Sequence, residues 1–419
     1  MEILLKGVKI IDPKSSHHHS IKNVLIKNGK LEKISSKPIS SAKMYDAKGM
    51  ILSQGWFDFR ANFNDPGFEH KEDLASGCEA AMKGGFTRVA VLPNTNPIIQ
   101  SKGQVEYIKT KTANYLTNIY PIGAASVNTD GEEITEMLDM DAAGAIAFSD
   151  GEKPIWHTDL LLKSLQYLQK IDGLLINKPE DKLLTSHGDM HEGSTSTMLG
   201  LYGMPNISEV LMIKRDLEIL EYAGGKMHFA NISTKEGVKL IKDAKKKGLK
   251  ITCDVSVHHL VYEDTELVDF DTNLKSNPPF RSTSDRKALI KGLNEGTIDA
   301  IVSSHTPQNE ESKKLEFDLA EFGLLGLQVL YPMLNRLKDV ISQELMVDKL
   351  TNGPNEIVGL STETIEVGNR ANLTLFSPSE KWTFDAQSNA SKAKNSPLFG
   401  QELQGKIKAV FNDGKSYID

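Results

Sequence analysis

From Gly55 onward, the sequence alternates short apolar segments with longer segments that have the hydrophobic spacing of amphipathic helices. The short segments include residues 88–92, 145–148, 250–255 and 300–303, and the longer ones include residues 208–223 and 235–247. Parallel strands are joined by connections that usually contain a helix, so this alternation predicts a parallel sheet. Because the alternation repeats along most of the chain, it favours a closed (β/α)8 barrel.

Both ends of the chain have a different pattern, in which short alternating strands are separated by turn-forming residues. Strands are expected at residues 8–11, 24–27 and 31–34 near the start and at residues 371–376 and 406–411 near the end. We therefore predict that residues 1–52 and 356–419 form one small β-sandwich domain and that residues 53–355 form the barrel. A chain of 419 residues has room for a barrel of typical size with such a companion.

Composition excludes several classes of function. A net charge of -7 disfavours a nucleic-acid partner, which would require a basic surface. No segment approaches the roughly 18 uninterrupted apolar residues of a membrane span, and the first residues lack the apolar stretch and cleavage site of a secretion signal. The two cysteines, Cys78 and Cys253, lack the spacing of a thiolate metal site. We expect a cytoplasmic protein that contacts small molecules or proteins, without nucleic-acid or membrane partners.

Polar loops follow several of the expected strands, where barrel enzymes place their active sites. The loops and their flanks contain DPGFEHKEDLASG, AAMKGGFTRVAVLPNTNP, MHEGSTSTMLGLYGMP, VHHL, NPPFR and SPLFGQELQGK. In order and spacing, these motifs resemble the dihydroorotases of the long bacterial type found in multifunctional complexes, which belong to the amidohydrolase superfamily. The resemblance covers most of the chain. It implies a metal-dependent barrel that hydrolyses a cyclic amide in pyrimidine biosynthesis.

The first barrel strand departs from the pattern of that family. In the family this strand ends in a His-x-His pair that ligates zinc, and an arginine two residues later binds the substrate carboxylate. The corresponding residues here are Arg60, Asn62 and Asn64. A guanidinium has no lone pair to donate and stays protonated, so Arg60 would repel a divalent cation.

The other metal positions implied by the resemblance also differ. The spacing makes Gly151 the counterpart of the metal-binding aspartate, beside a surviving acid at Asp150. Two further histidine ligands of the family correspond to Lys178 and Asn231. We therefore expect that the zinc of the family is absent and that the chain has no other cofactor.

The catalytic position is replaced as well. The family aspartate that activates the metal-bound water corresponds to Ser304, whose hydroxyl has no useful pKa for that task. A substrate-contacting histidine of the family corresponds to Gln308. The substrate-binding remnants are Asn94 and Asn277, which could equally be turn residues, and His305, which we interpret as a packed or hydrogen-bonded remnant.

The remaining histidines provide no clear metal site. Residues 17–19 are three consecutive histidines, which cannot all face one ion and are expected in a polar loop of the β domain. His187 and His191 have i, i+4 spacing, but neighbouring glycines favour a loop. His258 and His259 follow a strand, where we expect them to shape a loop through hydrogen bonds.

We expect the replaced positions to converge at the C-terminal mouth of the barrel: Arg60, Asn62, Gly151, Lys178, Asn231 and Ser304. Arg60 and Lys178 should fill the former cation positions, because a buried cation needs a paired charge or a bound anion. Acids such as Asp58 or Asp150 are the expected partners. The added positive charge could also attract an anionic small molecule.

The leading hypothesis is a catalytically inactive homologue that acts as a structural partner of aspartate transcarbamoylase, as the family resemblance implies. Two alternatives remain open. The chain could be an active dihydroorotase or a related cyclic-amide hydrolase with a non-standard site, or it could be a sensor that binds a pyrimidine precursor. We also expect a homo-oligomer.

Overall fold

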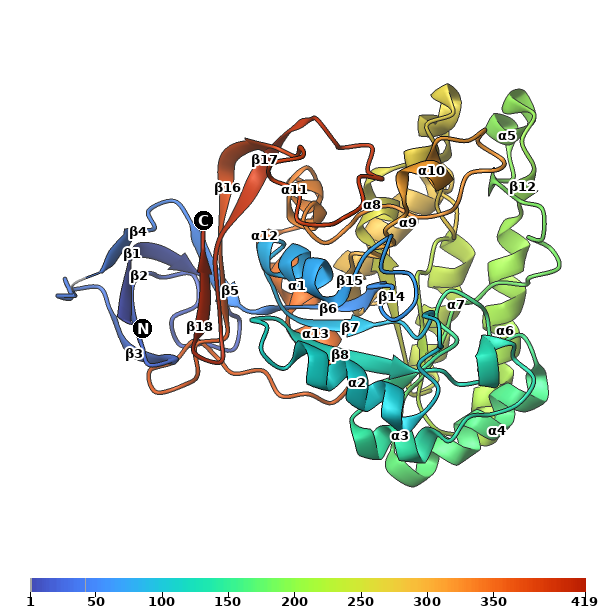
Figure 1. The fold of residues 1–419 in the computed structure, drawn as a ribbon, viewed down its shortest axis with the longest axis horizontal. Coiled ribbons are helices and arrows are strands. Elements are labelled where there is room, and N and C mark those ends of the chain that lie inside the picture. The colour runs from blue at the N-terminus through green and yellow to red at the C-terminus, as the bar shows by residue number, and fades with distance from the viewer. Residues whose placement is uncertain (1, 42) are drawn as a thin grey trace.

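The computed structural model describes residues 2–41 and 43–419, and it consists of a barrel and a smaller β-sheet part (Figure 1). The strands of the barrel follow one another in chain order and pair in parallel. A parallel bridge between Ala61 and His305 joins the first strand to the segment after the last. The strands are β6 (Trp56–Ala61), β7 (Phe86–Val91), β8 (Asn118–Gly123), β9 (Ala147–Phe148), β10 (Leu175–Asn177), β13 (Met227–Phe229), β14 (Ile251–Ser256) and β15 (Ala300–Val302). The expected (β/α)8 barrel is confirmed.

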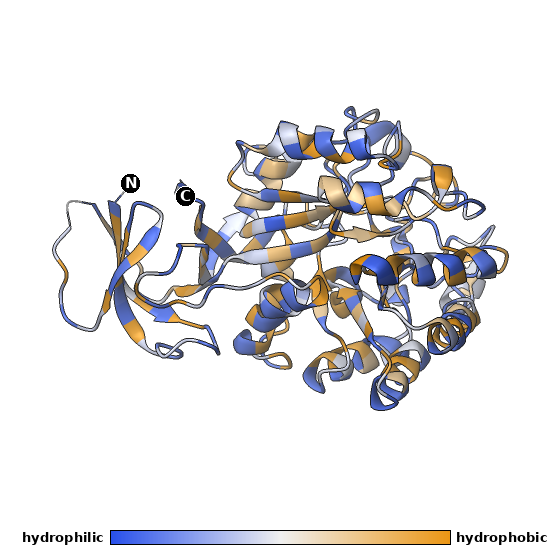
Figure 2. Cartoon of the chain, turned by 90° about the horizontal axis from the view of Figure 1, so that it is seen from below, coloured by the Kyte–Doolittle hydropathy of each residue, from blue (hydrophilic) through white to orange (hydrophobic). Residues whose placement is uncertain are grey.

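Helices surround the barrel, and capping side chains fix where several of them begin. The Asp73 side chain accepts from the Ser76 amide at 2.8 Å where α1 begins, and Thr234 accepts from the Gly237 amide at 3.0 Å where α7 begins. The helices carry hydrophilic and hydrophobic stripes, as expected for elements that pack on one side only (Figure 2). The longer helices are α1 (Leu74–Lys83), α2 (Lys102–Thr112), α3 (Met137–Ala143), α4 (Thr158–Leu168), α6 (Asn206–Ala223), α7 (Lys235–Lys246), α9 (Thr283–Asn294) and α12 (Gln343–Leu350).

Shorter elements form the connections between the main strands and helices. The short helices are α5 (Ser194–Leu199), α8 (Val257–Val261), α10 (Glu310–Lys313), α11 (Leu330–Asn335) and α13 (Asn352–Ile357). The 3-10 turns are η1 (Val127–Thr129), η2 (Gln169–Ile171), η3 (Asp264–Asp269) and η4 (Thr272–Leu274). A separate parallel pair is formed by β11 (Met190–His191) and β12 (Gly203–Met204). In the described residues, no helix is both long enough and apolar enough to cross a membrane.

Strands from both ends of the chain form the second sheet, in the order β18-β17-β16-β5-β1-β2-β3 with β4 beside β1. β5 joins the two ends, because it pairs in parallel with β1 and antiparallel with β16. The strands are β1 (Glu2–Ile10), β2 (Ile21–Lys27), β3 (Lys30–Ser35), β4 (Met44–Asp46), β5 (Ile51–Gln54), β16 (Leu373–Thr383), β17 (Glu402–Asn412) and β18 (Lys415–Ile418).

The far edge of this sheet returns to the segment that precedes β16. The Leu31 amide donates to the Asn369 carbonyl at 2.9 Å, and the Ala371 amide donates to the Gly29 carbonyl at 2.8 Å. The sheet therefore folds around its own apolar core, which includes Val8, Ile26, Leu52, Leu373 and Phe411. The two faces of the expected sandwich belong to one hydrogen-bonded sheet. The exact domain boundaries given above stay a prediction.

Aromatic packing joins the two parts of the molecule. The ring of Trp56, at the start of β6, lies 6.0 Å from that of Phe86 and 5.3 Å from that of Phe376 on β16. Tyr331 of α11 completes the cluster at 4.8 Å from Phe376. The second sheet thus contacts the barrel at the beginning of its first strand, while the polar positions singled out above follow the carboxyl ends of the strands.

Candidate functional site at the barrel mouth

The replaced positions come together where the barrel strands end. Arg60 lies near the end of β6, and its Nη2 donates to the carbonyl of Gly151, after β9, at 3.2 Å. Asn231, after β13, accepts from the hydroxyl of Ser304, after β15, at 2.8 Å. Residues that are far apart in sequence therefore share one site at the mouth.

The backbone at three of these positions has a left-handed conformation. The φ angles are 67° at Gly151, 54° at Asn231 and 46° at Ser304. Such angles suit glycine, are tolerated by asparagine and cost a serine about 1–2 kcal/mol. The surrounding structure thus holds the mouth loops in this conformation, even at Ser304, where it is unfavourable.

An ion pair with a buried cation occupies the first-strand side of the mouth. Arg60 is only 3% exposed, and its Nη2 lies 3.3 Å from Oε2 of Glu152. The Asn62 amide donates to Glu152 Oε1 at 2.9 Å. Burial by itself would raise the pKa of Glu152, but the charges of Arg60 and Lys178 and the Asn62 hydrogen bond hold that pKa below its usual value. Glu152 is therefore an ionised partner for the buried guanidinium.

A second ion pair lies beside the first. The Nζ of Lys178 is 2.9 Å from Oε2 of Glu180, and it donates to the Glu152 carbonyl at 3.3 Å. The Asn277 amide also donates to Glu180 Oε2 at 3.1 Å. Burial acts to raise the pKa of Glu180, yet Lys178 and three hydrogen bonds keep it below its usual value. Each buried cation of the mouth thus has its own carboxylate.

The expectation that Asp58 or Asp150 would pair with these cations is wrong. Asp58 accepts from the Ser303 amide at 2.8 Å, and Asp150 accepts from the Ser126 amide at 2.8 Å. Burial raises the pKa of Asp58 to about 7 and that of Asp150 to about 6. Both acids accept from the amide and hydroxyl of a serine, whereas the ion pairs of Arg60 and Lys178 are with Glu152 and Glu180.

A cavity of about 210 Å³ opens above the two ion pairs. Its walls include Lys178, Glu152, Asn231, Ser304, Asn277, His258, His259 and Gln308. His259 meets the expectation of a loop-shaping residue, because its Nε2 lies 3.0 Å from the Pro278 carbonyl. His258 does not, because neither of its ring nitrogens has a partner among the described residues. The mouth is therefore a polar cavity with unused hydrogen-bonding groups.

Comparisons with known proteins identify the family and the fold. A family model described as "Dihydro-orotase-like" matches residues 49–237. The chain is 36% identical to the dihydroorotase of Syntrophus aciditrophicus, over 99% of each chain. It is 37% identical to that of Pelotomaculum thermopropionicum, over 97% of this chain and 96% of that one. The chain belongs to the dihydroorotase family. In fold, this family member resembles the L-hydantoinase (dihydropyrimidinase) of Arthrobacter aurescens, with a TM-score of 0.86 at 21% identity over 100% and 96% of the two chains.

Asn94, a proposed substrate-binding remnant of this dihydroorotase-family chain, lies in the wall behind the cavity. Its Nδ2 donates to the Asp150 carbonyl at 3.0 Å, and its Oδ1 accepts from the Glu152 amide at 2.8 Å. A Cβ atom on Gly151 would overlap this Asn94 oxygen. Both polar groups of Asn94 therefore hold the loop that carries Glu152. Position 151 of that loop accommodates glycine, which has no Cβ atom.

His305 is also engaged away from the cavity. Its Nδ1 accepts from the Gly326 amide at 3.2 Å, which places the proton of the neutral ring on Nε2, 3.4 Å from Oε2 of Glu72. Only 1% of His305 is exposed. This geometry matches the packed, hydrogen-bonded remnant that we expected. His187 and His191 lie in the turn before β11 and in β11 itself, so neither is helical.

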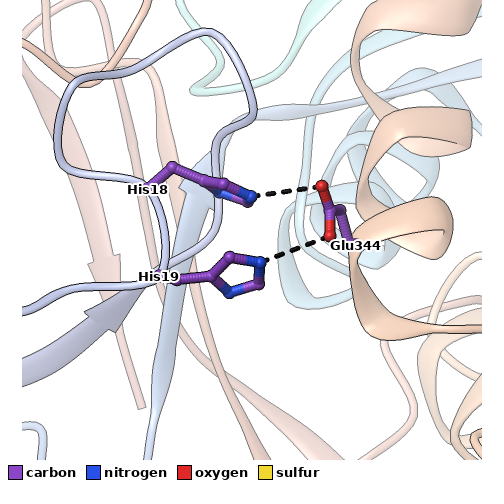
Figure 3. Close-up of side chains that lie close together, drawn as sticks. All are labelled: His18, His19 and Glu344. Carbon is purple, nitrogen blue, oxygen red and sulfur yellow. Dashed lines mark hydrogen bonds and ion pairs between the residues drawn. The ribbon is translucent and has the colours of Figure 1, made fainter.

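The described residues contain one group of three side chains that could reach a single metal ion, and it lies outside the mouth. His18, His19 and Glu344 meet where a loop of the second sheet touches α12 (Figure 3). Nε2 of His18 is 3.1 Å and Nε2 of His19 is 3.3 Å from the two oxygens of Glu344. However, Nδ1 of His18 accepts from the Asp12 amide at 3.2 Å, so its ring proton is on Nε2 and points at Glu344. A metal-bound histidine instead donates from its other nitrogen. We therefore interpret this group as a hydrogen-bonded contact between the two parts.

Proposed function

We propose that this dihydroorotase-family protein binds no zinc, hydrolyses no dihydroorotate and acts in the cytoplasm as a structural partner of aspartate transcarbamoylase. The observation that carries the loss of activity is the pair of ion pairs at the mouth. Arg60 with Glu152 and Lys178 with Glu180 place protonated side chains, with their own counterions, at positions that the family uses to bind metal. A divalent cation would have to displace both.

The residues present do not fit zinc. A catalytic zinc takes about three protein ligands with free lone pairs, from histidine, cysteine or carboxylate groups. The mouth positions are Arg60, Asn62, Gly151, Lys178, Asn231 and Ser304. Arginine and protonated lysine have no lone pair to offer, and the Asn231 oxygen already accepts from Ser304. Hydrolysis of a cyclic amide at neutral pH would then lack the metal-bound hydroxide that provides the nucleophile.

The two histidines that line the cavity with Ser304 do not replace the missing base. The Ser304 hydroxyl donates to Asn231 instead of to a histidine. Burial lowers the pKa of His258 to about 3 and that of His259 to about 4, so both rings are weak bases. A general base works best with a pKa near the working pH, and neither ring meets this condition.

The second candidate function is an active dihydroorotase, and the similarity to dihydroorotases over nearly the full chain favours it. One experiment decides between the two. The purified protein is dialysed against zinc, its bound metal is measured by mass spectrometry, and hydrolysis of dihydroorotate is followed with and without added zinc. The dihydroorotase of Syntrophus aciditrophicus, treated identically, is the positive control. We expect substoichiometric zinc and no turnover, and stoichiometric zinc with turnover would establish the enzyme.

A candidate surface for the proposed partner lies on the segment between β10 and α6. Leu183, Met198 and Tyr202 are 79%, 69% and 72% exposed there and supply large apolar side chains for a contact. Mixing the protein with aspartate transcarbamoylase from the same organism should give a complex in size-exclusion chromatography with light scattering. A Leu183→Ser/Tyr202→Ser variant should weaken the complex about tenfold or more, as for central apolar contacts. Val340→Ser, exposed elsewhere, is the control, and equal effects of both variants would contradict this surface. The same measurement on the protein alone tests the proposed homo-oligomer against the 46.3 kDa of one chain.

A further inference from the structure

Helix α6 carries apolar side chains on two of its sides. Its inward residues, such as Ile213 and Leu220, are buried, and α4 and α7 pack beside the helix (Figure 1). On the outward side, Ile207 is 46%, Leu211 is 44% and Tyr222 is 81% exposed. An amphipathic helix at a protein surface has one apolar stripe, so a second stripe indicates a surface that another molecule can cover.

The exposed residues of α6 lie on one side of the helix. Their positions are separated by three or four residues, which places them within about 80° around the helix axis at about 3.6 residues per turn. Two charged residues lie between the apolar ones. This outer stripe consists of Ile207, Leu211, Lys214, Glu218 and Tyr222. It is therefore apolar towards both ends and charged in the middle.

The two charges of the outer stripe are not used within the chain. Neither the Lys214 nor the Glu218 side chain has an ion pair or a hydrogen bond in the part of the chain that the structure describes. Elsewhere a pair with the same order and spacing does form, because Lys102 on α2 lies 3.8 Å from Glu106. A lysine that precedes a glutamate by four residues is the weaker order within a helix. Both charges are therefore available to another molecule.

A second copy of the same helix matches both the charges and the apolar residues. In an antiparallel pair with a two-fold axis level with Asp216, Lys214 lies opposite the partner's Glu218, and the same contact occurs twice. Leu211 then lies within one residue, about 1.5 Å along the axis, of the level of the partner's Tyr222. A parallel pair would place like charges opposite each other. The pattern of the stripe therefore fits one arrangement of two identical chains.

We propose that two copies of this chain associate through antiparallel α6 helices, with Leu211 against the partner's Tyr222 and Lys214 paired with the partner's Glu218. A contact centred on one helix is smaller than the roughly 800 Å² per partner of a standard interface, so we expect a dissociation constant in the micromolar range. The proposal names the surface of the homo-oligomer proposed above and rests on the proposed function only in that respect. It is independent of whether the mouth binds zinc.

Exchange of the two charges tests the pairing. Lys214→Glu and Glu218→Lys each give the stripe two like charges, so self-association should weaken about tenfold or more in sedimentation velocity between about 1 and 100 μM. An equimolar mixture of these two variants should form a dimer with one chain of each, because every pair in it then joins opposite charges. Lys102→Glu and Glu106→Lys on α2 are the matched control, and they should self-associate like the unchanged protein, alone or mixed.

The apolar contact is tested by Leu211→Glu, which should also weaken the dimer about tenfold or more. Leu315→Glu, at a leucine of similar exposure outside α6, is its control, and circular dichroism checks that each variant is folded. A dimer that Leu211→Glu and the charge variants leave intact would overturn this interface but not the proposed homo-oligomer. An unchanged protein that stays monomeric at about 100 μM would overturn both. If stripe variants of a monomeric protein instead lose binding to aspartate transcarbamoylase, the stripe belongs to that partner and the proposal is wrong.

Discussion

The barrel mouth and the contact around His18 show opposite relations between residue type and metal binding. The mouth brings together positions that the family resemblance assigns to a metal site, and Arg60 and Lys178 lie there with their own carboxylates. The contact in Figure 3 has side chains of the type that bind metals, but they are hydrogen-bonded to one another. Position in the fold and residue type are each insufficient, because an ion needs free lone pairs directed at one point.

The two regions also differ in how their charges are held. At the mouth the cations are nearly fully buried, and removal of one partner leaves the other charge without compensation. At the His18 contact, 45% of the Glu344 side chain is exposed, so water can replace a lost partner. Removal of one charged partner should therefore lower the free energy of unfolding by a large amount at the mouth and by a small amount at the His18 contact.

The largest effect is expected for Lys178→Met. This change leaves Glu180 buried without its counterion, and we expect the free energy of unfolding to fall by about 4 kcal/mol. Urea denaturation at neutral pH measures it. Lys381→Met is the matched control, because Lys381 forms an exposed ion pair with Glu402 and should lose less than about 1 kcal/mol. Similar losses in the two variants would show that the pair at the mouth is not effectively buried.

The next largest effect is expected for Gly151→Asp, which introduces the aspartate that the family resemblance implies at this position. The backbone there has a φ of 67°, and the new Cβ would overlap the Asn94 oxygen that holds the loop. We expect a loss of about 3 kcal/mol, from strain of about 1–2 kcal/mol and weakened hydrogen bonds of about 1 kcal/mol each. Rebuilding the metal site would therefore require changes beyond the ligand positions.

Gly359→Asp is the control for the Gly151 variant. Gly359 has a φ of 69° with no neighbouring atom near its Cβ position, so it reports backbone strain alone, about 1–2 kcal/mol. Adding Asn94→Ala to Gly151→Asp should remove the overlap and recover part of the difference. If the two aspartate variants are equally stable in thermal denaturation, the overlap has no consequence and the loop is freer than the structure implies.

Much of the architecture could be predicted from sequence, because strand and helix periodicities persist along the chain. The segment expected at residues 300–303 is β15 (Ala300–Val302), and the helix expected at 235–247 is α7 (Lys235–Lys246). The convergence of Arg60 and Ser304 could be predicted because the carboxyl ends of parallel barrel strands meet at one face.

Which acid pairs with which cation could not be predicted. Asp58 lies two residues before Arg60, yet its side chain is directed at Ser303. Glu152 reaches Arg60 only because Gly151 turns the loop through a left-handed conformation. In the sequence, Glu152 and Glu180 are ordinary acids in polar loops, and the direction of a side chain there depends on backbone angles that periodicity does not specify. The contact of His18 with Glu344 joins residues 326 positions apart and has no sequence signal.

A smaller effect is expected from the cavity histidines in acid. Burial first, then His259 and His305, lowers the folded-state pKa of His258 to about 3, below the usual 6.5. The unfolded chain therefore binds the proton first, so the contribution of His258 to stability is full above pH 6.5 and is lost as the pH falls toward 3. Between pH 6 and 4.5 the loss should be about 2 kcal/mol, at about 1.4 kcal/mol per pH unit.

The variant His258→Phe removes this titration with little change in side-chain volume. Urea denaturation between pH 7 and 4.5 should then show a shallower fall in stability than the unchanged protein, by about 1.4 kcal/mol per pH unit below 6. His259→Phe should give a similar decrease in slope, because burial, followed by the charge of Arg281, lowers its pKa to about 4. An unchanged slope in both variants would mean that the rings gain a proton in the folded cavity, and the neutral assignment would be wrong.

The smallest effect is expected for Glu344→Gln at the His18 contact. Glu344 lies in the first turn of α12, where a negative charge is mildly favourable, and its side chain is partly exposed. The glutamine keeps an oxygen that can accept from Nε2 of His18, so we expect a loss of about 0.5 kcal/mol. Added zinc should not raise the melting temperature of the unchanged protein more than that of His18→Gln/His19→Gln, because the His18 proton points at Glu344 and Nε2 of His18 therefore has no lone pair for the ion. A zinc-dependent rise that the double variant abolishes would show that the Asp12 hydrogen bond is weak enough to be exchanged for a metal, and the contrast between the two regions would then rest on the mouth alone.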